Sequence, residues 1–498
     1  MSLDEIWARL EAHRPIALTE LFAANQDRLR QFSGEQSGIL FDFSKTHLTS
    51  SIVADFVALA KASNLGGKRD DLFNGQVVNV TEGRAAEHTA ERGEGNRFSV
   101  QRAKSQQAKM RILVEAIDKD VFGGVDHILH LGIGGSALGP KLFIDALGRD
   151  MARYDVEVVS NVDGCAIKEA VLRFDPNRTL VVVASKTFTT TETLLNASSA
   201  IDWMTASGVD DPYGKFVGLT AAPAKAVEWG IDESRILAFS ESVGGRYSIW
   251  SAIGFPVAVA LGWKGFEDLL AGAAEMDRHF QSAPVEENWP MIGAFVDLYY
   301  SQIKGAQTRA VFSYDERMRL LSSYLQQLEM ESNGKRVTET GELLTRQSSP
   351  VTWGGVGTDA QHAVFQMLHQ GTALIPSEFV ASIEPGHELT SPHHQQLLGN
   401  CFAQGAALMA GRPHPDEARA YPGNRPSTTL LLNRLDPRTF GALIAFYEHR
   451  TFVNAVLLGI NPFDQFGVEL GKQMAKEIES GDGDFDASTR ALLERVGL

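Results

Sequence analysis

The sequence predicts an α/β protein with mainly parallel sheets flanked by helices. Short runs rich in β-branched residues alternate with stretches of helical composition, which is typical of parallel strands joined by helices. Polar or glycine-rich turns directly follow several of these runs, as they do at the carboxyl ends of strands in open α/β sheets. The runs in the first half of the chain are VDHILHLGI, YDVEVVS, RTLVVVAS, GKFVGLT and SRILAFS.

This pattern defines a first region and suggests how the rest is organised. It covers residues 105–265, which we predict to form a smaller α/β domain. Beyond it, GFEDLLAGAAEMDRHFQ has the apolar stripe of a helix, and TRAVFSY and GTALIPSEFVASI resemble strands. The first hundred residues are mostly helical and show no boundary of their own. We therefore expect residues 1–104 and 266–498 to form one larger, discontinuous α/β domain with helical segments at both ends of the chain.

Composition restricts the classes of function. The chain has 498 residues, 44% of them hydrophobic, and a net charge of -16 without any acidic or basic block. This argues against non-specific binding to nucleic acid or to an anionic membrane, so a phosphorylated ligand would need a local positive site. Cys165 and Cys401 cannot form a disulfide framework, and their isolation argues against a zinc site. With no signal-like N-terminus and no membrane-spanning window, we expect a cytoplasmic protein.

Two turns after predicted strands are rich in groups that bind anions. In GIGGSALGP, the glycines allow backbone N–H groups and a helix N-terminus near Gly135 and Ser136 to face an anion, although an ordinary tight turn would look the same. In SKTFTTTET, an ammonium and several hydroxyls stand between a strand end and a helix start. A threonine N-cap beside a solvated lysine is the alternative. Together the turns favour a phosphate site. The side chains in the second turn are Ser185, Lys186, Thr187 and Thr190.

Two further segments suggest a base and a fixed positive charge. Arg246 follows two glycines in SVGGRYSIWSAIG, and an arginine stays protonated and can stabilise an oxyanion. A structural ion pair would explain it equally well. In SSYLQQLEMESNGK, Gln327 and Glu331 share a helix face, and Asn333 and Gly334 end the helix. Glu331 is therefore a candidate general base, with a merely solvated glutamate as the alternative.

Two helices carry candidate acid/base groups. His362 and His369 in TDAQHAVFQMLHQGT are seven residues apart, too far for one metal ion to be favoured. His369, at the helix end, fits an acid/base histidine. The alternative is a buried histidine whose hydrogen bonds are all made within the protein. In NPFDQFGVELGKQMAKEIE, Gln465, Glu469 and Lys472 repeat at helical spacing, so Lys472 faces either a pocket or solvent.

Taken in the order in which they occur along the chain, these segments resemble those of the glucose-6-phosphate isomerase (phosphoglucose isomerase) family. ESVGGRYSIWSAIG and FDQFGVELGK correspond to the two signature stretches of that family, and NVTEGRAAEH, GIGGSALGP, SKTFTTTET, MESNGK and QHAVFQMLHQGT are also similar to family segments. The resemblance extends from about Asn79 to Lys472. It implies two doubly wound domains of the sugar-isomerase type and a homodimer with shared active sites. It also implies reversible conversion of glucose 6-phosphate to fructose 6-phosphate, in glycolysis and gluconeogenesis, without a metal or organic cofactor.

The resemblance also assigns roles. Glu331 matches the base that moves a proton between C2 and C1 through a cis-enediol, and Arg246 would stabilise the negative charge. His369, supplied by the partner subunit, would open the sugar ring, with Lys472 assisting near the ring oxygen. The residues matching the phosphate site are Ser136, Ser185, Lys186, Thr187 and Thr190. Those matching other substrate contacts are Gly135, Gly245, Gln327 and Gln465.

Three other functions remain open on the sequence. A non-catalytic sugar-phosphate sensor would need the phosphate site but could dispense with Glu331 and His369. An isomerase that moves a hydride with a divalent metal would need a ligand cluster that the sequence does not suggest. Additional activity on mannose 6-phosphate depends on the shape of the pocket.

Overall fold

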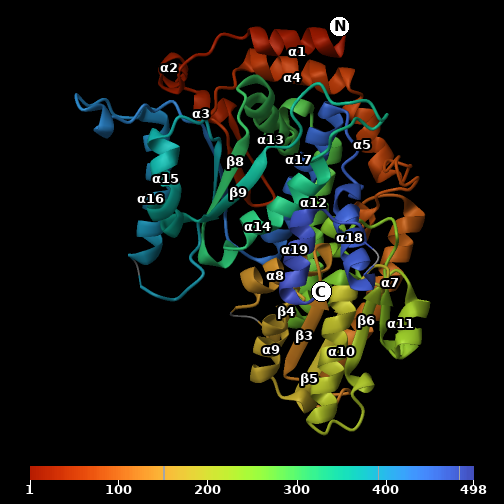
Figure 1. Ribbon diagram of the computed structural model, residues 1–498. Helices are drawn as coiled ribbons and strands as arrows, with labels where there is room; N and C mark the ends of the chain where they lie inside the picture. The colour runs from red at the N-terminus through yellow and green to blue at the C-terminus, as the bar shows by residue number, and fades with distance from the viewer. Residues whose placement is uncertain (150–151, 391, 482) are drawn as a thin grey trace. The chain divides into compact units, whose positions relative to one another are not determined.

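The computed structural model describes residues 1–149, 152–390, 392–481 and 483–498. Within these residues the chain forms two compact units, Met1–Pro462 and Phe463–Leu498, and each is described by itself. The first unit holds two sheets, and Figure 1 shows helices packed around both. The predicted α/β class is confirmed.

The first sheet has the strand order β4-β3-β5-β6-β7 and is parallel throughout. All of the expected runs form strands here. The β5 valines Val181 and Val183 are fully buried in a hydrophobic core with Ala197 and Met204 of a flanking helix, as expected for a strand covered by helices. The strands are β3 (His127–Gly132), β4 (Asp155–Val159), β5 (Thr179–Ala184), β6 (Phe216–Thr220) and β7 (Ile236–Ala238). The helices around it are α7 (Arg97–Asp118), α8 (Gly135–Leu147), α9 (Gly164–Arg173), α10 (Thr191–Ala206) and α11 (Pro223–Trp229).

The second sheet has the strand order β1-β2-β11-β10-β8-β9 and is mainly parallel. An N-terminal hairpin turning at Ser37 and Gly38, both with positive φ, adds its second strand antiparallel to β11. This hairpin was not expected from the helical composition of the first hundred residues. The domain boundaries near residues 105 and 265 stay a prediction. The strands are β1 (Ser33–Gln36), β2 (Ile39–Asp42), β8 (Thr308–Tyr314), β9 (Val351–Val356), β10 (Ser377–Ser382) and β11 (Ser427–Leu432).

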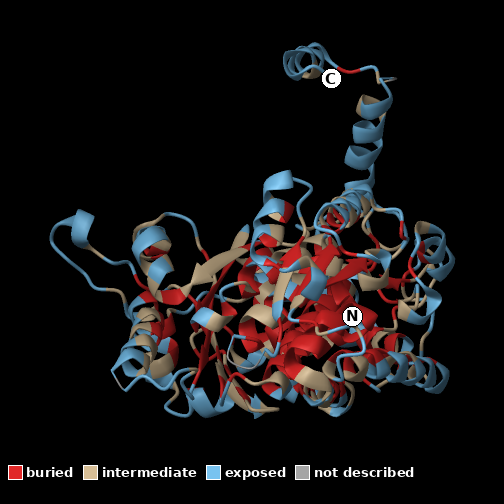
Figure 2. Ribbon diagram, turned by 90° about the horizontal axis from the view of Figure 1, so that it is seen from below, coloured by how far each residue is buried: buried red, intermediate tan, exposed pale blue. Residues whose placement is uncertain are grey.

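Two long helices, α12 (Phe255–Ser282) and α17 (Pro437–Leu458), form the centre of the first unit, where Figure 2 shows the buried residues concentrated. Glycines let them touch: a Cβ on Gly272 would lie 1.7 Å from the Arg438 carbonyl oxygen, and one on Gly441 would lie 2.1 Å from that of Leu269. The helices elsewhere in this unit are α1 (Leu3–Ala12), α2 (Leu18–Ala24), α3 (Arg28–Gln31), α4 (Ser50–Ala62), α5 (Leu65–Phe73), α6 (His88–Glu91), α13 (Trp289–Leu298), α14 (Leu321–Leu325), α15 (Gly357–Gln370) and α16 (His393–Ala410).

Several short helical segments complete the chain. Two are π-helical, η7 (Tyr299–Ile303) and η9 (Gln326–Glu331), and two consecutive 3-10 turns, η4 (Gly245–Trp250) and η5 (Ala252–Gly254), precede α12. The second unit contains η11 (Phe466–Val468), α18 (Glu469–Ser480) and α19 (Ala487–Val496). None of the helices in the described ranges has both the length and the apolar character needed to cross a bilayer.

Candidate active site

A buried arginine faces a partly accessible carboxylate where η4 meets the end of η9. Arg246 Nη1 lies 3.0 Å from Glu331 Oε1, and the exposed fraction is 1% for the arginine side chain and 23% for the glutamate. Arg246 Nε donates to Ser332 Oγ at 2.6 Å, and Nη2 donates to the Pro462 carbonyl. Gln327 Nε2 donates to Glu331 Oε2 at 2.8 Å. The guanidinium is therefore fixed, while its carboxylate partner can be reached from solvent.

Aromatic side chains pack around Arg246. The Tyr247 hydroxyl lies 2.9 Å from Ser332 Oγ, and the Tyr247 ring lies beside the Arg246 guanidinium. His88, from the NVTEGRAAEH segment, stacks on Tyr247 with ring centroids 4.7 Å apart. Burial lowers the pKa of His88 well below its ordinary value, so the ring is neutral and adds no charge. Arg246 therefore supplies the positive charge at this point.

The glycine-rich turn after β3 lies directly against the turn that carries Arg246. A Cβ on Gly135 would lie 2.1 Å from the carbonyl carbon of Gly245, a contact that no side chain could make. Gly134 has a φ of 55°, and a Cβ there would lie 3.2 Å from Gln327 Nε2. The absence of side chains at these glycines brings Ser136 and the N-terminus of α8 close to Arg246 and Gln327.

The hydroxyl-rich turn after β5 starts beside the first one, because Gly132 and Ala184 are paired neighbours at the ends of adjacent parallel strands. Ser185 Oγ lies 3.0 Å from Thr190 Oγ1, and of the described residues at the start of α10 none donates a backbone N–H to that threonine hydroxyl. Thr190 is the N-cap residue of α10, as the alternative interpretation of the sequence expected, but its hydroxyl does not cap the helix. The N-terminus of α10 keeps its capacity to bind an anion.

Lys186 is held over this turn by backbone oxygens. Its Nζ donates to the carbonyls of Glu241 at 2.6 Å and Val243 at 3.1 Å. Burial, together with the nearby positive charge of Arg84, lowers the pKa of Lys186 to about 8. Since the ammonium is bound by neutral carbonyls, its charge stays available for an anion at this edge of the sheet.

His369 lies elsewhere, near the C-terminal end of α15. Its Nε2 lies 2.9 Å from Gln404 Oε1 on α16, and its ring packs edge-on against Tyr421. It borders an open hollow of about 680 Å³, and among the described residues that line this hollow neither Arg246 nor Glu331 is found. The lining residues include Gln361, His362, Gln366, Gln404 and Arg412. Within one chain, His369 is not brought together with Glu331.

Lys472 and Gln465 belong to the second unit. Lys472 is exposed on α18, with its Nζ 3.2 Å from Glu469 Oε1. Gln465 precedes the 3-10 turn η11, so the predicted helix containing all three residues is wrong at its start. Helical spacing alone did not reveal that a short 3-10 turn precedes α18.

Across the ranges that the structure describes, no three or more His, Cys, Asp or Glu side chains gather in a way that could hold a metal ion. Both cysteines are free thiols, and burial raises the pKa of Cys401 to about 12. The groups gathered at the candidate site are the carboxylate, the guanidinium and the two polar turns.

Sequence reasoning missed the groups that hold Arg246. Ser332 and Tyr247 are adjacent to the proposed residues within the same motifs, so their polar side chains gave a weak signal. His88 and the Pro462 carbonyl come from distant segments, and no local pattern in the sequence relates them to Arg246.

A fixed guanidinium beside an accessible carboxylate, next to polar and glycine-rich turns of a parallel α/β sheet, is the arrangement that isomerases need to move a proton adjacent to a carbonyl. The family model described as Phosphoglucose isomerase matches residues 42–493. The chain belongs to the phosphoglucose isomerase family, which confirms the resemblance seen in the sequence.

Individual relatives agree with this assignment. The chain is 66% identical over 491 residues to a glucose-6-phosphate isomerase of Rhizorhabdus wittichii, with 98% of each chain covered. It is 58% identical to one of Zymomonas mobilis, with 99% of this chain and 97% of the relative covered. A crystal structure of a glucose-6-phosphate isomerase from Chlamydia trachomatis superposes with a TM-score of 0.91 at 30% identity, covering 99% of this chain and 98% of that one.

Proposed function

We propose that the chain catalyses the reversible isomerisation of glucose 6-phosphate to fructose 6-phosphate, with Glu331 as the base and Arg246 as the fixed positive charge. Membership of the family and the high identity to glucose-6-phosphate isomerases support the reaction. The observation that carries the assignment of residues is the Arg246–Glu331 pair, in which the arginine is buried and the carboxylate is accessible.

The chemistry requires this combination. A proton next to a carbonyl is weakly acidic, so the site must supply both a base and positive charge for the developing oxyanion. In the open-chain aldose, Glu331 takes the proton from C2 while the C2–H electrons form the C1–C2 double bond of the enediol. Arg246 offsets the negative charge on oxygen. As the C2 hydroxyl proton passes to O1 and the C2=O bond forms, the electrons of the C1–C2 double bond take the proton back from Glu331 at C1. Gln327 supports the carboxylate through its 2.8 Å hydrogen bond.

The phosphate of the substrate binds at the opposite end of the sugar in this proposal. The two turns at the ends of β3 and β5 supply hydroxyls, backbone N–H groups and the Lys186 ammonium, and the substrate lies between them and Arg246. Contacts to Gly135 and Gly245 follow from the direct approach of their backbones. Binding energy from the phosphate fixes the reacting carbons against the base. The proposed phosphate ligands are Ser136, Ser185, Lys186, Thr187 and Thr190.

Ring opening requires a second subunit in this account. His369 borders its own hollow, away from Glu331, which supports a homodimer in which each subunit lends this histidine to its partner. We assign Lys472 and Gln465 to the same step and to substrate positioning. The reaction needs neither metal nor organic cofactor, and we propose a cytoplasmic enzyme of glycolysis and gluconeogenesis.

A mixing experiment tests the shared site. Glu331→Gln and His369→Ala proteins, each inactive alone, are expected to regain part of the wild-type activity after subunit exchange, because a hybrid dimer contains one site with both groups intact. Exchange is verified with two affinity tags of different type. A verified hybrid that remains as inactive as its parents would contradict sharing.

The reaction itself is tested by supplying glucose 6-phosphate with a metal chelator and measuring the fructose 6-phosphate formed. Turnover that the chelator does not affect is expected. Activity lost with chelator and restored by a divalent ion would favour the metal-dependent hydride shift. Binding of the sugar phosphate by folded protein without turnover would favour the sensor. Mannose 6-phosphate, assayed in parallel, measures how strictly the pocket selects the C2 epimer.

A further inference from the structure

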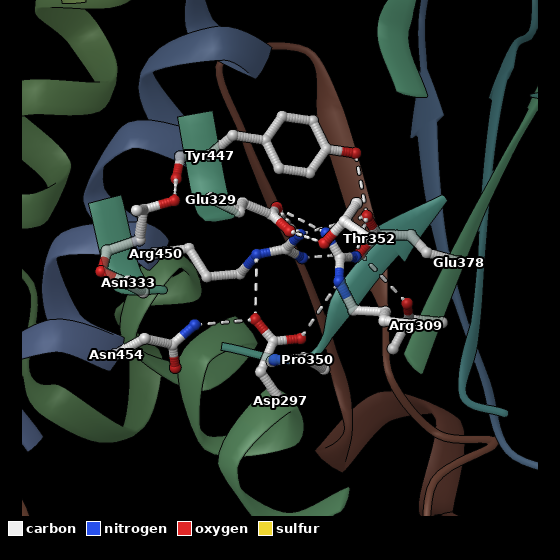
Figure 3. Close-up of polar contacts among 12 residues, drawn as sticks. Asp297, Arg309, Glu329, Asn333, Pro350, Thr352, Glu378, Tyr447, Arg450 and Asn454 are labelled. Carbon is white, nitrogen blue, oxygen red and sulfur yellow. Dashed lines mark hydrogen bonds and ion pairs between the residues drawn. The ribbon is translucent and has the colours of Figure 1, made fainter. Parts of the chain in front are cut away.

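Beside the proposed active site, a cluster of five charged side chains lies in the interior (Figure 3). Two guanidinium groups stand between three carboxylates, and each of these side chains is at most 10% exposed. Charges are tolerated in such an interior only when they are paired and hydrogen-bonded, so the geometry of the cluster is strongly constrained. The members are Asp297 on α13, Arg309 on β8, Glu329 on η9, Glu378 on β10 and Arg450 on α17.

Glu329 is the member that belongs to the same segment as the proposed base. Its Oε1 accepts from Arg309 Nη2 at 2.5 Å and from Arg450 Nη2 at 3.2 Å, and its Oε2 accepts from Thr352 Oγ1 on β9 at 2.6 Å. Both carboxylate oxygens are thus engaged by donors from β8, β9 and α17. These contacts tie η9 to the second sheet and to the central helix.

Glu331 follows two residues later, and its carboxylate lies 3.0 Å from Arg246 Nη1. The next residues are also fixed: Ser332 Oγ accepts from Arg246, and Asn333 Nδ2 donates to the Thr451 carbonyl at 2.9 Å. The proposed base therefore stands between two anchored positions. A π-helical turn is rare and often occurs at functional sites, and here side chains on both sides of Glu331 hold it.

We propose that Glu329 is a positioning residue for Glu331: its carboxylate, bound by Arg309, Arg450 and Thr352, sets the turn of η9 that presents Glu331 to Arg246 and to the substrate. The inference rests on the proposed function, in which Glu331 is the base. Glu329 is a poor candidate for the base itself, because it is buried and ion-paired with two arginines. Although burial acts to raise it, the two arginines lower the pKa of Glu329 and keep it ionised.

The mildest test removes one anchor without changing the volume of the core. Thr352 is fully buried, and Thr352→Val replaces the hydroxyl that donates to Glu329 with a methyl group of similar size. We expect kcat per folded chain to fall about tenfold with KM within twofold of wild type, short of the 10²-fold that a misplacement of 1 Å can cost. Thr352→Ser keeps the hydroxyl and is expected to retain kcat within about twofold. The folded fraction of each sample is measured by circular dichroism.

Glu378→Gln is the matched control, since it removes a carboxylate from the same cluster but from β10. Arg309, Arg450 and Thr352 still reach Glu329 in this variant, so we expect a lower melting temperature and kcat per folded chain within about twofold of wild type. The proposal is overturned if Thr352→Val keeps the wild-type kcat, if its loss merely tracks the folded fraction, or if Glu378→Gln lowers kcat equally.

Failure of the underlying function gives a different result. An inactive wild-type chain, or a fully active Glu331→Gln protein, would overturn the proposed function and the role of Glu329 with it. An active wild type and an inactive Glu331→Gln protein, combined with an unaffected Thr352→Val protein, would overturn the role of Glu329 alone.

Discussion

Two arginine–carboxylate sites share one short π-helical segment, and they differ in their access to solvent. Glu331 is 23% exposed and faces Arg246, whereas Glu329, two residues earlier, is 10% exposed and enclosed by Arg309, Arg450 and Thr352. We propose that the same residue types form a reactive pair at Glu331 and a structural one at Glu329. Solvent access and the number of unoccupied lone pairs, rather than residue type, separate the two roles.

The largest effect is expected from the accessible carboxylate. Glu331→Gln removes the base but keeps the shape and the contact to Gln327, so kcat should fall by about 10³- to 10⁴-fold while the protein still binds sugar phosphate. Steady-state kinetics and calorimetric titration measure the two quantities. Glu342→Gln, at an exposed glutamate eleven positions later in the chain, is the control. Activity of Glu331→Gln within a few-fold of wild type would refute the assigned base.

The second-largest effect on kcat is expected from Arg246, the buried arginine of the same pair. Arg246→Met removes the charge that stabilises the oxyanion, and kcat is expected to fall by about 10²- to 10³-fold. Arg246→Lys keeps a positive charge but loses the planar guanidinium that contacts both Glu331 and Ser332. Its kcat should therefore lie between those of the wild type and of Arg246→Met. A methionine variant that lowers affinity but leaves kcat unchanged would show that Arg246 binds substrate without stabilising the transition state.

The enclosed cluster should affect stability instead of rate. Glu378→Gln breaks a buried network and should cost about 3 kcal/mol of unfolding free energy in urea titrations. Burial opposes ionisation of Glu378, but Arg450 and Arg309 outweigh it and hold its pKa at about 2, below the ordinary value of 4.5. A lowered carboxyl pKa contributes stability above pH 4.5 that is lost as pH falls from 4.5 to 2. In that range the wild type should lose more stability than the variant, and parallel curves would contradict this.

The smallest effect concerns the phosphate end. Lys186→Ala should raise KM about tenfold or more with a smaller change in kcat, since a hydrogen bond to a charged group contributes about 1.5–3 kcal/mol. Because the pKa of Lys186 is about 8, its positive charge is lost as pH rises through that value. Wild-type kcat/KM should therefore decline above pH 8, and the alanine variant should lack this decline. An unchanged KM would count against the phosphate site.

The sequence predicted the parts of the fold that depend on local patterns. The valines of β5 identify a strand covered on both faces, and the glycines before Ser136 and Arg246 mark close turns. The hairpin at Ser37 and Gly38 was missed because its strands are only four residues each and partly polar.

The site was predicted less completely, for a related reason. The four-residue spacing of Gln327 and Glu331 indicates that their side chains meet, but it does not distinguish a π-helical turn from an α-helix. The anchors of Glu329 come from β8, β9 and α17, and Arg450 lies more than a hundred positions away in the chain. Such contacts depend on the tertiary fold, so local periodicity carries no sign of them.

The most direct test of the account follows the proton that Glu331 is proposed to move. Fructose 6-phosphate is isomerised in D₂O with a chelator present, and NMR measures deuterium at C2 of the glucose 6-phosphate formed. Turnover with substantial deuterium at C2 is expected for the wild type, and loss of both is expected for Glu331→Gln. Deuterium incorporation that persists at the wild-type rate in Glu331→Gln would contradict the assignment of the accessible carboxylate as the base.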